Sequence, residues 1–73
     1  MAMSLGEIVA RNLRRVRKER GLSQEALADL VGINRNYVGM IERRENSPTV
    51  DMVERLALAL EIDPVDIFKG ERP

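Results

Sequence analysis

The sequence contains no cysteine and no histidine. Without cysteine the chain can form neither a disulfide nor a thiolate metal site, and without histidine it lacks the commonest metal ligand and general base. No nucleophile stands beside a base, and no metal-ligand cluster or phosphate-binding loop is visible. We therefore expect a protein that is not an enzyme and that needs neither a metal nor a cofactor.

Long apolar runs are missing too. No stretch approaches the roughly 20 apolar residues that span a bilayer, and the first residues, MAMSLGEIVARN, lack the apolar core of a signal peptide. We therefore expect an intracellular protein, with no membrane partner and no small-molecule ligand.

Aromatic residues are scarce, because the chain has only Tyr37 and Phe68. Aliphatic side chains must therefore fill the interior. In a chain of 73 residues, only roughly 60% of the unfolded surface can be buried. This favours one compact domain, residues 1–73, built from helices, and we expect no attached sensor or peptidase domain.

The net charge is zero, because twelve basic residues balance twelve acidic ones. The two signs are nevertheless unevenly spread along the chain. Residues 1–44 carry nine Lys and Arg against five Asp and Glu, whereas residues 45–73 carry three against seven. The chain is therefore polarised into a basic front half and an acidic back half.

The front half begins with two amphipathic helix patterns. The first is capped by Ser4 and stopped by Gly21. Its apolar residues recur at helical spacing and form one stripe: Leu5, Ile8, Val9, Leu13 and Val16. The second helix follows Ser23 and covers residues 24–31, after which Gly32 ends it by entering the left-handed conformation.

A third helix starts almost at once, with Asn34 as its N-cap, and is predicted to continue to about Arg44. Only Gly32 and one further residue separate the two helices, so they must meet at a steep angle. Val38 and Ile41 drive the third helix onto the core. At about 100° per residue, the opposite side carries an outward face with no core to fill: Asn36, Gly39, Met40 and Arg43.

The back half adds two helices, which makes the predicted fold all-α with five helices. Thr49 caps a fourth helix that reaches about Glu61. The core stripe of this helix consists of Val53, Leu56, Ala57 and Leu60. Asp63, followed by Pro64 at the first helical position, starts a short fifth helix that ends at Phe68.

Leu58 falls on the side of the fourth helix opposite that stripe. An exposed leucine alone means little, but further apolar residues follow it: Ile62, Val65, Ile67 and Phe68. Some of these must cover the core, and the others would form a self-complementary patch with Leu58. We therefore expect a homodimer through the fourth and fifth helices.

The stretch RGLSQEALADLVGINRNYVGMIERRENSPTVDMVERLALAL resembles the Cro and phage-repressor type of helix-turn-helix transcriptional regulators, often called the XRE family. Glutamine, alanine, glycine, two apolar residues and the following acid stand at the family's spacing. The resemblance extends from about Ile8 to Phe68. It implies a lambda-repressor-like domain, cytoplasmic and nucleoid-associated, that binds a palindromic operator in double-stranded DNA as a homodimer.

In such proteins the second helix of the pair enters the major groove, which shows a distinct pattern for every base pair. The resemblance assigns base reading to Asn34, Arg35, Asn36 and Met40. Arg35 would bridge O6 and N7 of guanine, Asn36 would pair with adenine, and Met40 would touch a thymine methyl. Gly39 departs from the family's side-chain-bearing residue and removes one potential reader. The alternative is that Asn34 is only a helix cap and that Arg35 and Asn36 are only solvated.

Phosphate contacts would hold this helix in register. Gln24 begins the second helix, where free backbone N–H groups and the positive end of the helix dipole can meet a phosphate. The other backbone candidates are Tyr37, Arg43, Arg44, Asn46 and Ser47. Alternatively, Tyr37 covers the edge of the core, and the turn after the third helix is a solvated loop.

Arg17 and Glu42 suggest a structural role. Arg17 flanks the apolar stripe of the first helix, and Glu42 flanks Val38 on the third, so folding should bring both to the edge of the core. The family commonly joins these two positions in an ion pair. We expect this pair to orient the third helix against the first.

The segments ERGLSQE and RNYVGMIERRENSPT look like small controller proteins of restriction-modification systems. These controller proteins share the one-domain plan expected here, and antitoxins and prophage repressors are the alternative assignments within the family. The alternative to a DNA-binding function is a protein-protein interaction module with a helix-turn-helix fold. Such a module would be an antitoxin or co-regulator without specific DNA binding of its own. The zero net charge supports this alternative, whereas the outward placement of Arg35, Asn36 and Arg43 supports DNA binding.

Overall fold

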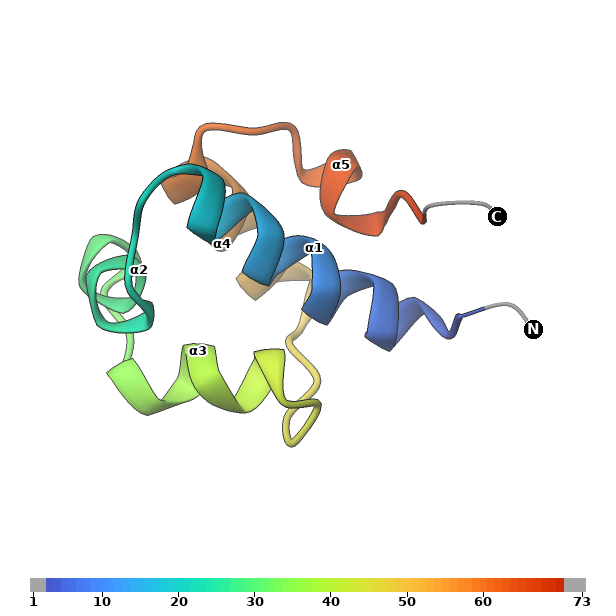
Figure 1. The fold of residues 1–73 in the computed structure, drawn as a ribbon, viewed down its shortest axis with the longest axis horizontal. Coiled ribbons are helices and arrows are strands. Elements are labelled where there is room, and N and C mark those ends of the chain that lie inside the picture. Colours follow the sequence, from blue (N-terminus) through green and yellow to red (C-terminus); the bar gives the residue numbers. More distant parts are fainter. Residues whose placement is uncertain (1–2, 71–73) are drawn as a thin grey trace.

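The computed structural model describes residues 3–70, which form five α-helices and no strand (Figure 1). The helices are α1 (Leu5–Glu19), α2 (Gln24–Val31), α3 (Arg35–Glu42), α4 (Val50–Leu60) and α5 (Pro64–Phe68). The predicted all-α architecture is therefore confirmed. Within the described residues, no helix is both long and apolar enough to cross a membrane.

Each helix begins where a polar side chain supplies a hydrogen-bond acceptor to the first turn, whose backbone N–H groups lack intrahelical partners. The side chains of Ser4, Ser23 and Thr49 each accept a bond from the N–H three residues further on. Those of Asn34 and Asp63 accept from the N–H two residues further on. All five predicted N-caps are confirmed.

The corner between α2 and α3 depends on Gly32, whose φ of 81° lies in the left-handed region. Its N–H donates to the carbonyl of Ala28 and closes the last turn of α2. Figure 1 shows α2 almost end-on and α3 lengthwise, so the two axes cross steeply, as predicted. As a result, α3 lies along one edge of the molecule.

The end of α3 differs from the prediction. The helix was expected to reach about Arg44, but it ends at Glu42 because Arg44 adopts a φ of 65° and turns the chain. The N–H of Glu45 then donates to the carbonyl of Met40 at 2.8 Å, and the N–H of Arg44 donates to the carbonyl of Ile41 at 3.0 Å. This pattern is a Schellman-type helix end in which arginine occupies the position usually taken by glycine.

The core is aliphatic and is shared by all five helices. Its largest fully buried side chains are Leu13, Leu27, Val38, Ile41, Leu56, Leu60 and Ile67. The predicted stripe of α4 is buried throughout. The predicted stripe of α1 is wrong at Leu5, which is the first residue of the helix and is 57% exposed.

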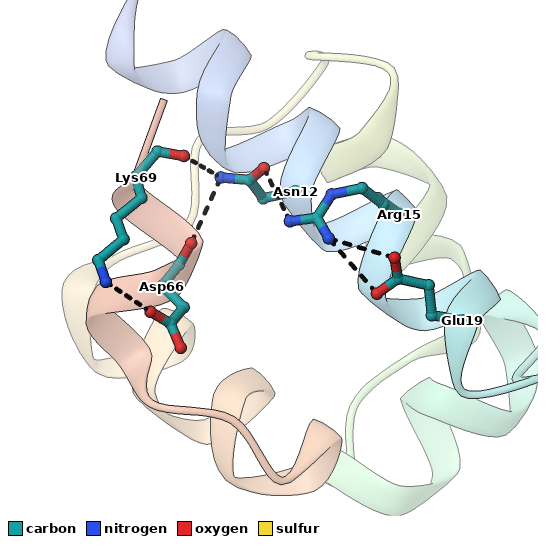
Figure 2. A network of polar contacts seen from close by, with 5 residues as sticks. All are labelled: Asn12, Arg15, Glu19, Asp66 and Lys69. Carbon is teal, nitrogen blue, oxygen red and sulfur yellow. Dashed lines mark hydrogen bonds and ion pairs between the residues drawn. The ribbon is translucent and has the colours of Figure 1, made fainter. Parts of the chain in front are cut away.

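A buried amide attaches α5 to α1, as Figure 2 shows. The side-chain nitrogen of Asn12 donates to the carbonyls of Ile67 and Lys69, both at 2.8 Å, and lies 3.5 Å from that of Asp66. The oxygen of the same amide accepts from Arg15. Asn12 thus satisfies carbonyls at the end of a five-residue helix, which would not be stable by itself in water.

Candidate nucleic-acid interface

The third helix presents its polar residues to solvent at the edge of the molecule. Asn34, Arg35 and Asn36 are exposed, whereas Val38 and Ile41 are at most 1% exposed and pack into the core. One side of α3 therefore packs against the core, and polar side chains at its N-terminal end point into solvent. This is the geometry that lets a helix enter a groove.

The middle of this outward face departs from the prediction at Gly39, which is buried rather than exposed. A Cβ atom on residue 39 would lie 2.7 Å from Nη1 of Arg43 and 3.1 Å from Oε1 of Gln24. Gly39 is buried because these two side chains cover it, not because the core does. Met40, one residue further on, is half-buried.

Arg43 lies back along α3 and forms an ion pair with Glu45. Its Nε donates to Oε2 of Glu45 at 2.9 Å, and its Nη2 donates to Oε1 at 3.3 Å. This hydrogen bond, together with the charge of the guanidinium, lowers the pKa of the Glu45 carboxyl, and Glu45 raises the pKa of Arg43 in the same way. The pair is therefore present at neutral pH and is lost only as the pH falls through the lowered pKa of Glu45.

At the N-terminal end of α3, two of the predicted base-reading residues, Asn34 and Arg35, contact other residues of the chain. The Asn34 side chain accepts from the N–H of Asn36 at 2.8 Å, so it acts as a helix cap. Nη1 of Arg35 lies 3.8 Å from Oε1 of Glu25 on α2, and both side chains are more than half exposed. Such an exposed pair contributes little to stability, so Arg35 remains available to a partner.

A buried network fixes the orientation of α3 relative to α1 and α2. Nε and Nη2 of Arg17 donate to the two carboxylate oxygens of Glu42, at 2.7 and 3.0 Å. The Gln24 side chain donates a third hydrogen bond to Glu42 at 3.1 Å, and Nη1 of Arg17 donates to the carbonyl of Leu22. The paired side chains are only 9% and 4% exposed. The ion pair therefore ties α3 to α1 and to the start of α2.

The remaining backbone candidates lie in different surroundings. Tyr37 is half-buried and packs against the main core, as the alternative interpretation proposed. Arg44 reaches back to the start of α1, where Nη1 donates to Oγ of Ser4 at 3.3 Å. Asn46 is half-buried and Ser47 is exposed in the turn before α4.

The predicted dimer residues are divided by the fold. Leu58 and Val65 are 69% and 59% exposed, and Ile62 and Phe68 are half-buried. Ile67 is only 1% exposed and packs in the cluster that joins α1, α4 and α5. Its assignment to a dimer surface is therefore wrong, because its side chain completes the core of the monomer.

The sequence did not predict a hydrogen bond from α4 that stabilises the corner between α2 and α3. Nη2 of Arg55, on α4, donates to the carbonyl of Val31 at 2.8 Å and so caps the C-terminal end of α2. A cation at this end of a helix also interacts favourably with the helix dipole. No local pattern indicated this bond, because 24 residues separate its two partners.

Comparison with known proteins agrees with this geometry. A helix-turn-helix family model matches residues 13–67. Control protein C.SmaI of Serratia marcescens is 43% identical over 58 residues, which cover 80% of this chain and 69% of that protein. The crystal structure of the restriction-modification controller protein C.AhdI from Aeromonas hydrophila matches with a TM-score of 0.82 and 40% identity, covering 86% of this chain and 96% of that one.

The structure of a third relative was solved with its operator DNA bound. The controller protein C.Esp1396I, as a tetramer in complex with its natural 35 base-pair operator, matches with a TM-score of 0.82 and 30% identity. The match covers 92% of this chain and 88% of that one. The chain belongs to the helix-turn-helix family of DNA-binding transcriptional regulators.

Proposed function

We propose that residues 1–73 form a DNA-binding domain that binds a palindromic operator as a homodimer and controls restriction-modification genes, acting in the cytoplasm at the nucleoid. One observation carries this proposal: α3 lies at the edge of the fold with Arg35, Asn36 and Arg43 exposed, while its other side packs into the core. The similarity to C.SmaI and C.AhdI supports the controller role.

Base reading by α3 follows from its dimensions and side chains. The major groove admits an α-helix, and arginine and asparagine are the side chains that pair bidentately with guanine and adenine. Arg35 and Asn36 stand in the first turn of α3, where no other helix covers them. Met40 follows on the same side and offers a thioether to a thymine methyl, while Asn34 caps the helix.

Backbone contacts flank this reading surface. Gln24 and the first N–H groups of α2 lie beside α3, because the Gln24 side chain bonds to Glu42. A helix N-terminus in this position binds a phosphate. Beyond the other end of α3, Arg44, Asn46 and Ser47 lie against the adjacent DNA backbone. Tyr37, at the edge of the core, contributes its hydroxyl.

Dimerisation follows from the exposed apolar residues of the last two helices. Leu58 and Val65 remain exposed in the monomer, with Ile62 and Phe68 half-buried beside the core. A two-fold axis through this surface places two copies of α3 on half-sites about one helical turn apart. The acidic residues around α5 then lie away from the phosphates.

A second candidate function is protein-protein interaction without specific DNA binding. It is favoured by the zero net charge and by the acidic partners of Arg35 and Arg43, which neutralise part of the reading face. Salt dependence separates the two functions, because a protein that neutralises several phosphates loses affinity steeply as salt rises. An affinity for DNA that does not change with salt would favour the interaction module.

Selection of bound DNA from a random pool tests the proposed function. The parent chain is expected to select a motif with two-fold symmetry. Arg35→Ala is expected to relax one position in each half and to lose about 1 to 3 kcal/mol of discrimination there. Arg20→Ala is the matched control, because it removes an exposed arginine that is ion-paired with Glu61 at the end of α4 and is not among the proposed DNA contacts. Selection of no motif by the parent chain would contradict the proposal.

A further inference from the structure

Gly39 occupies a position where glycine weakens the fold. It lies in the interior of α3, and glycine is a poorer helix former than alanine. The space its missing side chain leaves is filled by Arg43, whose Nη1 would be 2.7 Å from a Cβ atom there. Because helical side chains point toward the N-terminus, Arg43 extends back one turn. Its guanidinium therefore lies over the middle of the outward face, not beyond its C-terminal end.

Glu45 holds the guanidinium in this place. Its carboxylate accepts bonds from Nε and Nη2, and its own backbone is fixed because its N–H donates to the carbonyl of Met40 at 2.8 Å. These two side-chain bonds use the guanidinium edge that carries Nε and Nη2. Among the described residues, no hydrogen bond joins an acceptor to Nη1, so the adjacent edge, formed by Nη1 and Nη2, is not occupied by a bidentate partner within the chain.

We propose that Arg43 reads a guanine rather than binding a phosphate, and that Gly39 and Glu45 are the residues that position it. This inference rests on the proposed function. O6 and N7 of guanine accept two parallel N–H bonds from one guanidinium edge. A pair without net charge attracts a phosphate weakly, whereas a guanidinium whose orientation is fixed satisfies the geometry of a bidentate contact. Arg43 is thus a specificity-determining residue, about two turns from Arg35 along the chain.

The test measures base preference position by position, using the motif that the parent chain selects and its single-base variants. Arg43→Lys keeps the charge but cannot form the bidentate contact. It is expected to reduce the preference for guanine at one position in each half-site roughly ten- to hundred-fold. Its affinity for unrelated DNA should remain at the parent's level. Arg35→Ala is expected to relax a different position.

The two positioning residues are tested at the same base pair. Glu45→Gln removes the carboxylate charge with little change of shape, and Gly39→Ala places a methyl group 2.7 Å from Nη1, so the guanidinium must shift. Both variants are expected to reduce the preference for guanine at the same position of each half-site as Arg43→Lys does. Gly39→Ala keeps the fold, because alanine favours the helix, and circular dichroism checks this. A merely structural role of Gly39 would lower affinity for all sequences alike.

The exposed pair of Arg20 and Glu61, 3.9 Å apart, supplies matched controls. Arg20→Lys and Glu61→Gln are expected to leave every base preference unchanged. If Arg43→Lys weakens binding to all sequences equally and keeps the parent's preferences, Arg43 binds a phosphate and the inference is wrong while the proposed function stands. Unchanged guanine preference in Glu45→Gln or Gly39→Ala would overturn the positioning role of that residue. If the parent chain selects no motif, both the inference and the proposed function fail.

Discussion

At the scale of single residues, Glu42 has the most constrained chemistry in the molecule. Its carboxylate is almost fully buried and accepts three hydrogen bonds, two from Arg17 and one from Gln24. A buried charge is tolerated only when it is paired and its lone pairs are used. Because its partners come from α1 and from the start of α2, Glu42 helps to determine how α3 is oriented.

Glu42→Ala is expected to destabilise the fold by about 3 kcal/mol or more, because it leaves the buried charge of Arg17 without a partner. DNA affinity should fall with stability. Chemical denaturation measures the change, and Glu19→Ala, which removes an exposed pair with Arg15, is the control with little effect. Equal unfolding free energies for Glu42→Ala and the parent chain would contradict the architectural role of the pair.

At the scale of elements, the sequence best predicted those helix boundaries that are determined by residues close to them in the chain. All five N-caps, and the glycine that ends α2, follow from residues within one turn of the helix end. The end of α3 was missed because Arg44 adopts a left-handed conformation that glycine usually takes. The Asn12 amide was missed because its acceptors lie more than 50 residues away in the sequence.

The same limit applies to the recognition surface. Periodicity placed Gly39 on the outward side of α3, but it could not predict that the side chains of Arg43 and Gln24 would cover it. Periodicity also could not separate Ile67 from its exposed neighbours, because a five-residue helix has too few turns to define a face. Contacts between elements, and the direction of long side chains, required the structure.

Asn12 is expected to determine whether α5 stays attached to α1. Asn12→Ala removes the donor to buried carbonyls, and each unsatisfied group of this kind costs about 1 to 3 kcal/mol. Asn12→Asp should be worse, because it has nearly the same shape and directs a negative charge at the same carbonyls. Hydrogen exchange in α5, together with chemical denaturation, measures both effects. An aspartate variant as stable as the parent would contradict this role of the amide.

The corner between α2 and α3 provides a prediction with a natural comparison. Gly32 and Gly21 both have a positive φ, and each has room for a methyl group. Alanine at either position should therefore cost about 1 to 2 kcal/mol through the backbone alone. DNA affinity is then measured at a temperature where both variants are folded. Of the two, only Gly32→Ala should lower it, because Gly32, unlike Gly21, lies at the corner that orients α3. Equal affinities of the two folded variants would contradict this.

At the scale of the whole molecule, charge and exposed apolar surface are separated along the chain. The basic front half contains the helix-turn-helix, and the acidic back half contains the exposed Leu58 and Val65. Figure 1 places α3 and α5 on opposite sides of α1. Under the proposed function, this arrangement keeps the acidic residues around α5 away from the phosphates and leaves a surface for a second copy.

Leu58→Asp is expected to weaken the homodimer by about 1 to 2 kcal/mol and to lower operator affinity, while the monomer remains folded because residue 58 is 69% exposed. Val50→Asp is the matched control for the oligomeric state, since Val50 is an exposed apolar residue of α4 outside the predicted patch. Sedimentation at tens of micromolar follows the oligomeric state. A parent chain that stays monomeric with operator DNA bound would contradict the predicted interface.

Methylation interference on the selected operator tests most directly whether α3 reads the major groove. Dimethyl sulfate modifies N7 of guanine in the major groove and N3 of adenine in the minor groove, so one experiment compares the two grooves. Because the major groove admits an α-helix, we expect modified guanines to block binding in two half-sites about one helical turn apart. Interference only from modified adenines, or from neither base, would contradict the central claim that the corner at Gly32 presents α3 to DNA.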